Sequence, residues 1–332
     1  MKELVAKMVE CYGPSGHERN VRCLIEEQLA EQISAGKVNV RTDAMGNLVV
    51  HREGKGKRVM LAAHMDEIGL IVTHVDEKGF LRFAAVGGVS PLTLIGSRIR
   101  FADGVVGVLG WEKWLQETTL PNWGELFADV GATSRSDCPV SIGDVACFLH
   151  PFEDLGGRLV AKAMDDRIGC AVVLQTLLDL EDSLYDVYVV FTVQEEVGTR
   201  GATVATFGIR PDVALAIDVT PVRDTPEARP VNMQLGQGPA IKLMDAGMLA
   251  HPGVKEWMVH TAERIGIPYQ LEVLERGGTD ARAMQLSREG IPAGCLSIPC
   301  RYVHTPSEMV DYTDVTQAKD LLRSLLSTDI DI

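Results

Sequence analysis

Two adjacent glutamates, Glu195 and Glu196, follow the apolar segment 186–193, DVYVVFTV, with a single glutamine between. A pair of glutamates is most often a solvated turn, because charged side chains are rarely buried. Other apolar segments of this chain, however, also end in side chains that can bind a metal. These side chains are His64 after RVMLAA, Asp218 after VALAI and His304 after GCLSIPCRYV, and Asp165 and Asp166 stand in AKAMDDR just before a predicted helix.

The positions of these side chains predict that they lie close together. In an open α/β sheet the carboxyl ends of parallel strands meet at one edge, where ligands bind. Each residue also has a simpler interpretation: Asp165 or Asp166 could cap a helix, His64 could be a core histidine, and the others could be loop residues. If every simple interpretation held, the repulsion among the gathered acids would be uncompensated. A bound divalent cation removes that repulsion.

The ligand types and their number indicate which metal and how many ions. Two imidazoles and several carboxylates, with no thiolate beside them, suit Zn²⁺, Co²⁺ or Mn²⁺. One catalytic zinc ion typically needs three protein ligands, whereas two metal ions about 3.5 to 4 Å apart can share a bridging carboxylate and need about five in all. The sequence supplies that set with one glutamate left over.

The surplus glutamate suggests that the Glu195 and Glu196 pair divides its work. One of the two would bind metal, and the other would act as general base and acid on the water that attacks the substrate. The sequence alone does not assign the two roles. Asp66, two residues after His64, could hold the other ring nitrogen of that histidine, or it could be a free acid at a strand end.

Alternating helix and strand patterns must position these residues. After two helical patterns at about 1–11 and 17–34, the segments NLVVHR and KRVMLAAH predict strands. Residues 69–157 show short β-branched runs separated by Gly, Pro and Asp turns, which predict a small all-β module. From residue 158 onward helix and strand patterns alternate, which indicates a mainly parallel sheet with helices on both faces. We expect an α/β domain, residues 1–68 and 158–332, interrupted by the β insert 69–157.

Composition excludes several classes of partner. The chain has 332 residues, 46% of them hydrophobic, and can form two domains. A net charge of -14 without a Lys and Arg cluster argues against nucleic acid, and no apolar run approaches the ~20 residues of a membrane span. The N-terminal segment MKELVAKMVECYG predicts an amphipathic helix and not a targeting segment. Seven cysteines without a CxxC pair favour reduced thiols and a cytoplasmic protein.

Six motifs taken together resemble those of the tetrahedral dinuclear metallo-aminopeptidases, which are called glutamyl or deblocking aminopeptidases and are sometimes labelled cellulases. In chain order the motifs are AAHMDEIG, AKAMDDRIG, TVQEEVGTRGA, LAIDVT, GGTDA and RYVHTPSEM. Each motif is weak alone, but six in this order, with a β insert between the first two, are a specific combination. The resemblance covers essentially the whole chain, and no catalytic position departs from it.

The resemblance implies two divalent metal ions per subunit, Zn²⁺ or Co²⁺ before Mn²⁺. His64, Asp165 and Asp218 would bind one ion. Asp165, Glu196 and His304 would bind the other, which makes Asp165 the bridge.

The resemblance also implies roles for the neighbouring residues. Glu195 corresponds to the general acid and base, and Asp66 corresponds to the partner that orients His64. The peptide bond between Asp165 and Asp166 corresponds to one that is often cis in such sites.

The resemblance further implies a substrate and an assembly. Short peptides would lose one residue at a time from a free N-terminus. The insert would be a PDZ-like domain that pairs subunits, and six dimers would close into a hollow tetrahedral dodecamer. The loop of Gly277, Gly278, Thr279 and Asp280 would line the substrate pocket, with Asp280 near the bound amine or the first side chain. The simpler interpretation is a glycine turn that leaves Asp280 near a helix N-terminus.

Three other functions are compatible with parts of the pattern. A deacylase of N-blocked amino acids could use the same metal chemistry, because a dinuclear metal site can hydrolyse the amide bond of a peptide or of an N-acyl group. A glycosidase would need two carboxylates and no catalytic metal. A non-catalytic shell would not need Glu195 beside a full ligand set. For the first residue of the substrate we expect neutral or aliphatic side chains before acidic ones.

Overall fold

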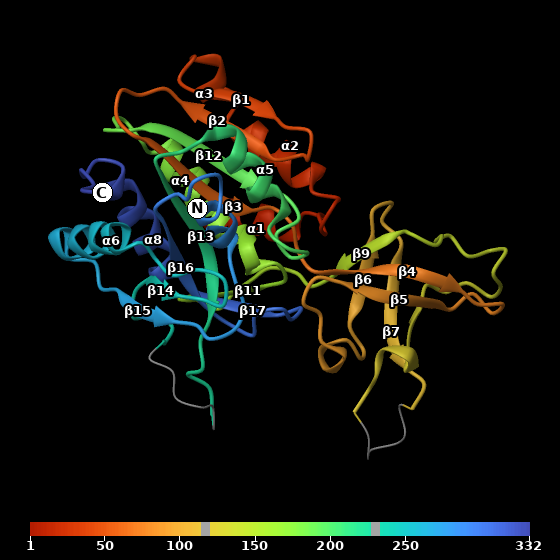
Figure 1. Cartoon of the computed structure of the whole chain (residues 1–332). Coiled ribbons are helices and arrows are strands. Elements are labelled where there is room, and N and C mark those ends of the chain that lie inside the picture. The colour runs from red at the N-terminus through yellow and green to blue at the C-terminus, as the bar shows by residue number, and fades with distance from the viewer. Residues whose placement is uncertain (114–119, 227–232) are drawn as a thin grey trace.

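The computed structural model describes residues 1–113, 120–226 and 233–332 of the chain. Figure 1 shows a twisted sheet packed between helices and, beside it, a small barrel built from strands β4 to β9. Among the helices in these ranges, none is both long enough and apolar enough to cross a lipid bilayer.

The described part of the chain forms one eleven-stranded sheet. Its main path, from edge to edge, is β1 (Asn39–Thr42), β2 (Leu48–Arg52), β12 (Asp186–Thr192), β3 (Arg58–His64), β13 (Val213–Pro221), β16 (Ala293–Arg301), β17 (Glu308–Asp311), β11 (Arg158–Ala161) and β10 (Glu153–Asp154). Off this path, β14 (Ala240–Met244) pairs with β16 and with β15 (Gln270–Val273).

The sheet is mixed, and the expectation of a mainly parallel sheet was wrong for its flanks. The four central strands, β12, β3, β13 and β16, are parallel to one another, while β1, β2, β17, β11 and β10 pair antiparallel. Only short loops join β1 to β2 and β16 to β17, and a short loop allows an antiparallel pair but not a parallel crossover. The central strands carry the predicted helix and strand alternation.

Helices cover both faces of the sheet, as the alternation predicted. Successive residues of β3 point to opposite faces. Val59, Leu61 and Ala63 join the larger apolar core, and Met60 and Ala62 join the smaller one. The larger core contains residues of α1 (Lys2–Glu10), α2 (Arg19–Gln28), α4 (Met164–Leu178), α6 (Pro252–Ile265) and α8 (Tyr312–Leu325). The smaller core contains residues of α5 (Arg200–Ile209) and α7 (Asp280–Gln285), and the short α3 (Ala30–Ser34) follows α2.

The β insert closes into a barrel with its own apolar core. The strands, in order around the barrel, are β4 (Gly69–Val75), β5 (Leu81–Val86), β8 (Leu126–Asp129), β7 (Val106–Trp111), β6 (Arg98–Phe101) and β9 (Val145–Phe148). Two short 3-10 turns, Pro91–Thr93 and Trp123–Glu125, lie between strands. Within the predicted insert, β10 pairs with β11 of the large sheet. The domain boundaries and the PDZ-like character of the insert stay predictions.

Candidate metal centre

The ends of the central strands face one cavity of about 510 Å³. Strand β3 ends at His64, and Glu195 follows β12 by three residues. Asp218 lies within β13, and His304 follows β16 by three residues. Because parallel strands end at the same edge of a sheet, residues far apart in the sequence meet there. The predicted metal ligands and the predicted acid and base that line this cavity are His64, Asp165, Glu195, Glu196, Asp218 and His304.

Asp165 lies between the two histidines. Its Oδ1 is 3.0 Å from His64 Nε2, and its Oδ2 is 3.3 Å from His304 Nε2. The same two nitrogens also approach a second carboxylate: Glu196 Oε2 is 3.2 Å from His304 Nε2, and Asp218 Oδ1 is 3.9 Å from His64 Nε2. Each oxygen of Asp165 therefore faces a different histidine, as a bridging carboxylate would.

Asp166 has a different environment from its neighbour. The peptide bond between Asp165 and Asp166 is cis. The Asp166 carboxylate accepts the backbone N–H of Gly169 at 3.1 Å and the backbone N–H of His64 at 3.3 Å. A side chain at position 169 would overlap this carboxylate, which explains the glycine. Asp166 thus caps the first turn of α4, the simpler interpretation that the sequence had left open for one of the pair.

Asp66 holds the backbone of the glutamate pair. Its Oδ1 accepts the N–H of Glu195 at 2.9 Å, and its Oδ2 accepts the N–H of Glu196 at 3.1 Å and the hydroxyl of Ser15 at 2.6 Å. His64 Nδ1 lies 3.1 Å from the main-chain oxygen of Asp66 and 3.5 Å from its carboxylate. The carboxylate was expected to orient His64, but its hydrogen bonds to the two glutamates are the shorter contacts.

Glu308, at the start of β17, was missed by reasoning from the sequence. This buried carboxylate accepts the N–H of Asp165 at 2.9 Å and the N–H of His304 at 2.7 Å. His304 has a φ of 62°, in the left-handed region that a non-glycine residue adopts only when its surroundings hold it there. The signal was present in the motif HTPSEM, where an acid opens a buried strand.

The barrel also contributes to the wall of the cavity. Gly87 and Gly88 follow β5, and Gly88 lines the cavity. A Cβ at Gly88 would lie 2.6 Å from His304 Cε1, and a Cβ at Gly87 would lie 3.1 Å from Glu196 Cβ. The main chain of the insert therefore packs directly against two of the predicted ligands, and only glycine permits this approach.

The charges at this edge are strongly perturbed. Burial raises the pKa of Glu195 and of Asp218 well above the ordinary carboxyl value. Burial, reinforced by Asp165, also raises the pKa of Glu196. Burial lowers the pKa of His304, but its hydrogen bonds to Asp165 and Glu196 outweigh that effect and raise the pKa to about 12. Burial thus disfavours the charged form of these three carboxyl groups, and a divalent cation would favour it by compensating their negative charge.

Two groups of side chains at this edge could each hold a metal ion, but neither is one of the triads that the resemblance implied, because His64 and not Asp165 is common to both. Ligand atoms of His64, Asp165 and Glu196 lie within 4.8 Å of one another, and so do those of His64, Asp166 and Asp218. Among the described residues, the buried Oε1 of Glu196 has no hydrogen-bond partner, which leaves it available as a ligand. Nitrogen and carboxylate oxygen donors without sulfur suit Zn²⁺, Co²⁺ or Mn²⁺.

The predicted substrate loop is split between the cavity and the core. Gly277, Gly278 and Thr279 line the cavity, whereas Asp280 is not among its lining residues. Asp280 begins α7, and its Oδ2 accepts the hydroxyl of Thr192 at 2.5 Å. Burial raises the pKa of Asp280 to about 6. The structure thus agrees with the simpler interpretation of Asp280, next to the helix N-terminus, and its contact with substrate stays a prediction.

Known proteins resemble this chain over nearly its whole length. Residues 46–321 match the model of the M42 glutamyl aminopeptidase family. A putative aminopeptidase of Acetivibrio thermocellus is 45% identical over 324 residues, which cover 97% of each chain. The solved structure of aminopeptidase APDkam598 from the archaeon Desulfurococcus kamchatkensis is 41% identical, with a TM-score of 0.94, and the match covers 99% of this chain and 94% of that one.

A second solved structure is informative for its assembly. The TET1 peptidase of Pyrococcus horikoshii, described as able to assemble into a tetrahedron or a large octahedral shell, is 31% identical with a TM-score of 0.87. The match covers 98% of both chains. Together with the family match and the gathered ligand set, these likenesses identify the type of enzyme. The chain belongs to the M42 glutamyl aminopeptidase family and is an enzyme that hydrolyses peptide bonds.

Proposed function

We propose that this protein is an aminopeptidase with two metal ions, which removes the N-terminal residue of short peptides. The observation that carries the proposal is the position of Asp165, whose two oxygens face two different histidines. A carboxylate in that position can be shared by two cations. His64 and Asp218 would complete one site, and Glu196 and His304 would complete the other. Asp166 is the less suitable ligand, because both of its oxygens already accept backbone N–H groups.

Bound divalent ions would polarise the substrate carbonyl and lower the pKa of the attacking water. Glu195 lines the same cavity, and its backbone is fixed by Asp66. Its carboxylate would take a proton from that water and deliver the proton to the departing amine. The raised pKa of Glu195, caused by burial, suits a group that must hold a proton between these two steps.

A panel of chromogenic aminoacyl substrates tests this proposal. Each substrate is assayed with a free and with an N-acetylated amine, after treatment with a chelator and after addition of Zn²⁺, Co²⁺ or Mn²⁺. We expect hydrolysis of the free-amine series alone, its loss with the chelator, and its return with metal. Equal hydrolysis of the acetylated series would instead identify a deacylase, and activity that survives the chelator would reject the metal mechanism.

The proposal includes an assembly and a location. The barrel, residues 69–157, would be the PDZ-like domain that pairs two subunits, and the pairs would close into a dodecamer. The relative described as able to assemble into a tetrahedron, which matches 98% of this chain, supports this proposal. Seven free cysteines are compatible with a cytoplasmic location.

A further inference from the structure

Besides histidines, one lysine and two arginines line the catalytic cavity, the cavity of about 510 Å³ at the strand ends, and they differ in what they contact. Lys242 is buried, and its Nζ lies 3.1 Å from Glu272 Oε1, so its charge is compensated. Arg276 and Arg282 are exposed at the cavity wall. Within the described ranges, neither arginine forms an ion pair or a side-chain hydrogen bond. Two guanidinium groups thus face the substrate space without a carboxylate partner.

Arg282 is held by its aliphatic stem. It lies in α7, and the stem packs on the main chain of Gly247. A Cβ at Gly247 would lie 2.9 Å from Arg282 Cγ, so only glycine leaves room for the stem in this position. The turn that carries Gly247 is rigid, because Asp245 Oδ1 accepts the N–H groups of Gly247 and Met248 at 2.7 Å. Because the stem is already ordered, binding of a ligand by Arg282 would cost less side-chain entropy than binding by a fully mobile arginine.

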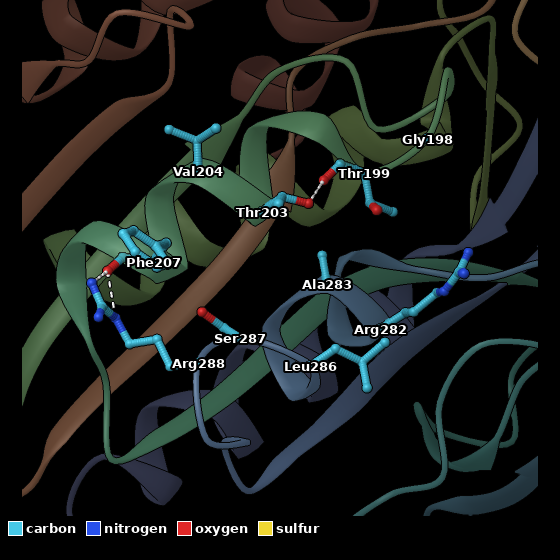
Figure 2. A pocket seen from close by; sticks show the side chains of 10 residues that line it. All are labelled: Gly198, Thr199, Thr203, Val204, Phe207, Arg282, Ala283, Leu286, Ser287 and Arg288. Atoms are coloured by element: carbon cyan, nitrogen blue, oxygen red, sulfur yellow. Dashed lines mark hydrogen bonds between the residues drawn. The ribbon is translucent and has the colours of Figure 1, made fainter.

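Arg282 also stands where two cavities meet. A second cavity of about 600 Å³ lies between α5 and α7 and shares Gly198, Thr199 and Arg282 with the catalytic cavity. Figure 2 shows the guanidinium of Arg282 at the opposite end of this second cavity from Arg288 and directed away from Ser287. A peptide that occupied both cavities would therefore pass Arg282.

Arg288 provides a contrast in the same cavity. Its Nε donates to the main-chain oxygen of Phe207 at 2.9 Å, and its guanidinium lies 3.7 Å from the centre of the Phe207 ring. Figure 2 shows this contact at the end of the cavity away from Arg282. The guanidinium of Arg288 is therefore engaged within the fold, whereas that of Arg282 is available to a ligand.

We infer that Arg282, assisted by Arg276, binds a carboxylate of the peptide substrate. This inference rests on the proposed aminopeptidase function. A guanidinium binds a carboxylate through two parallel N–H bonds, and such charge-assisted bonds are about twice as strong as neutral ones. Without these cations the acidic cavity would repel an anionic peptide. The carboxylate can come from an acidic first side chain or from the C-terminus of a short peptide, and both sources present the same chemistry to Arg282.

Four tripeptides separate the two sources. They are Glu-Gly-Gly and Met-Gly-Gly, each with a free and with an amidated C-terminus. For the wild-type protein we expect kcat/KM to be about 10- to 100-fold higher for peptides that carry the recognised carboxylate. Arg282→Gln should remove most of that preference and leave Met-Gly-Gly amide unaffected, and Arg276→Gln should remove part of it. If the preference follows Glu, the first side chain is the source; if it follows the free terminus, the C-terminus is the source.

Two controls isolate the guanidinium of Arg282. Arg288→Gln removes an arginine of the second cavity whose head group is engaged within the fold, and it should leave the carboxylate preference, the ratio of the kcat/KM values, unchanged. Gly247→Ala keeps Arg282 but displaces its stem, and it should weaken the carboxylate preference in the same direction. If Arg282→Gln and Arg276→Gln change all four peptides equally, or none of them, the inference is wrong.

Binding measurements separate this inference from the proposed function. The same four peptides are titrated calorimetrically into Glu195→Gln protein, with and without Arg282→Gln. A carboxylate preference that depends on Arg282 supports the inference, even if no variant turns over peptide and the aminopeptidase proposal fails. Normal turnover together with equal binding of all four peptides would overturn the inference alone.

Discussion

The carboxylate of Asp66 accepts the backbone N–H of Glu195 at 2.9 Å, and its second oxygen accepts the next N–H along the chain at 3.1 Å. A buried carboxylate therefore lies against the main chain of both glutamates. Burial raises the pKa of Asp66, but its contacts with His64, Ser15 and Glu195 lower it below the ordinary value. Asp66 therefore remains an acceptor at neutral pH, and it fixes where the two glutamate side chains begin.

Replacing Asp66 by Asn should misplace both glutamates. The amide oxygen can accept one backbone N–H, but the amide nitrogen then faces a second donor. We expect turnover to fall about 10- to 100-fold, the usual effect of removing a group that positions metal ligands, and some metal to be lost. Ser15→Ala removes only one donor to Asp66 and should have a smaller effect on kcat. Equal kcat values for the Asp66→Asn and wild-type proteins would contradict the positioning role.

Glu195→Gln and Glu196→Gln should fail in different ways. Glu195→Gln removes no ligand, so both metals should stay bound while kcat falls about 10²- to 10⁴-fold, the usual contribution of a positioned acid and base. Glu196→Gln should weaken one metal site, and excess metal should restore part of its activity by mass action. Metal content and kcat, measured for both variants across a metal titration, distinguish the ligand from the acid and base. Rescue of Glu195→Gln by metal would show that the two roles are reversed.

Asp165→Ala should lose both metals, because this residue alone is common to the two proposed sites. His304→Ala should mainly vacate one site. Elemental analysis of dialysed protein gives the number of ions per subunit for each variant, with two expected for the wild type. A wild-type protein that holds a single ion, unchanged in Asp165→Ala, would exclude a shared carboxylate.

Gly88→Ala should disturb His304 from the side of the barrel. The added Cβ would overlap the imidazole ring, so the ring must leave the position in which it contacts Asp165 and Glu196. We expect lower occupancy of one metal site and lower kcat, with the thermal unfolding midpoint little changed. Gly157→Ala is the matched control, because a Cβ there meets nothing within 4 Å. If the two variants behave alike, the packing of Gly88 on His304 has no functional role.

The purified protein should have a mass far above that of one chain in light scattering. Strands β4 and β9 pair at Leu70 and Ala146, so a short linker can replace the barrel strands between them, and that deletion should abolish dimers. A milder variant, Val106→Asp with Val108→Asp, alters two half-exposed residues of β7 and should lower the mass if this face pairs. Circular dichroism checks that both variants fold. An active wild-type monomer at micromolar concentration would reject the assembly.

The sequence predicted which side chains gather at the sheet edge better than it predicted the residues that support them. His64, Asp218 and Glu196 could be recognised because each follows an apolar run that ends at one edge of the sheet. The contacts of Asp66 and Glu308 could not, because both residues act through backbone N–H groups whose direction depends on loop geometry. Periodicity predicted the four parallel strands, but it carries no information on the direction in which short edge strands pair.

Gly87 and Gly88 make the barrel part of the wall around the candidate metal centre. Both residues belong to the insert, yet their main chain borders Glu196 and His304. If the barrel were replaced by the barrel of a relative, part of the cavity wall would be replaced as well. The barrel and the α/β domain therefore cannot be exchanged independently of each other. Sequence changes that alter how this barrel packs on the large sheet will therefore also reshape the space in which a peptide is cut, and the two properties must evolve together.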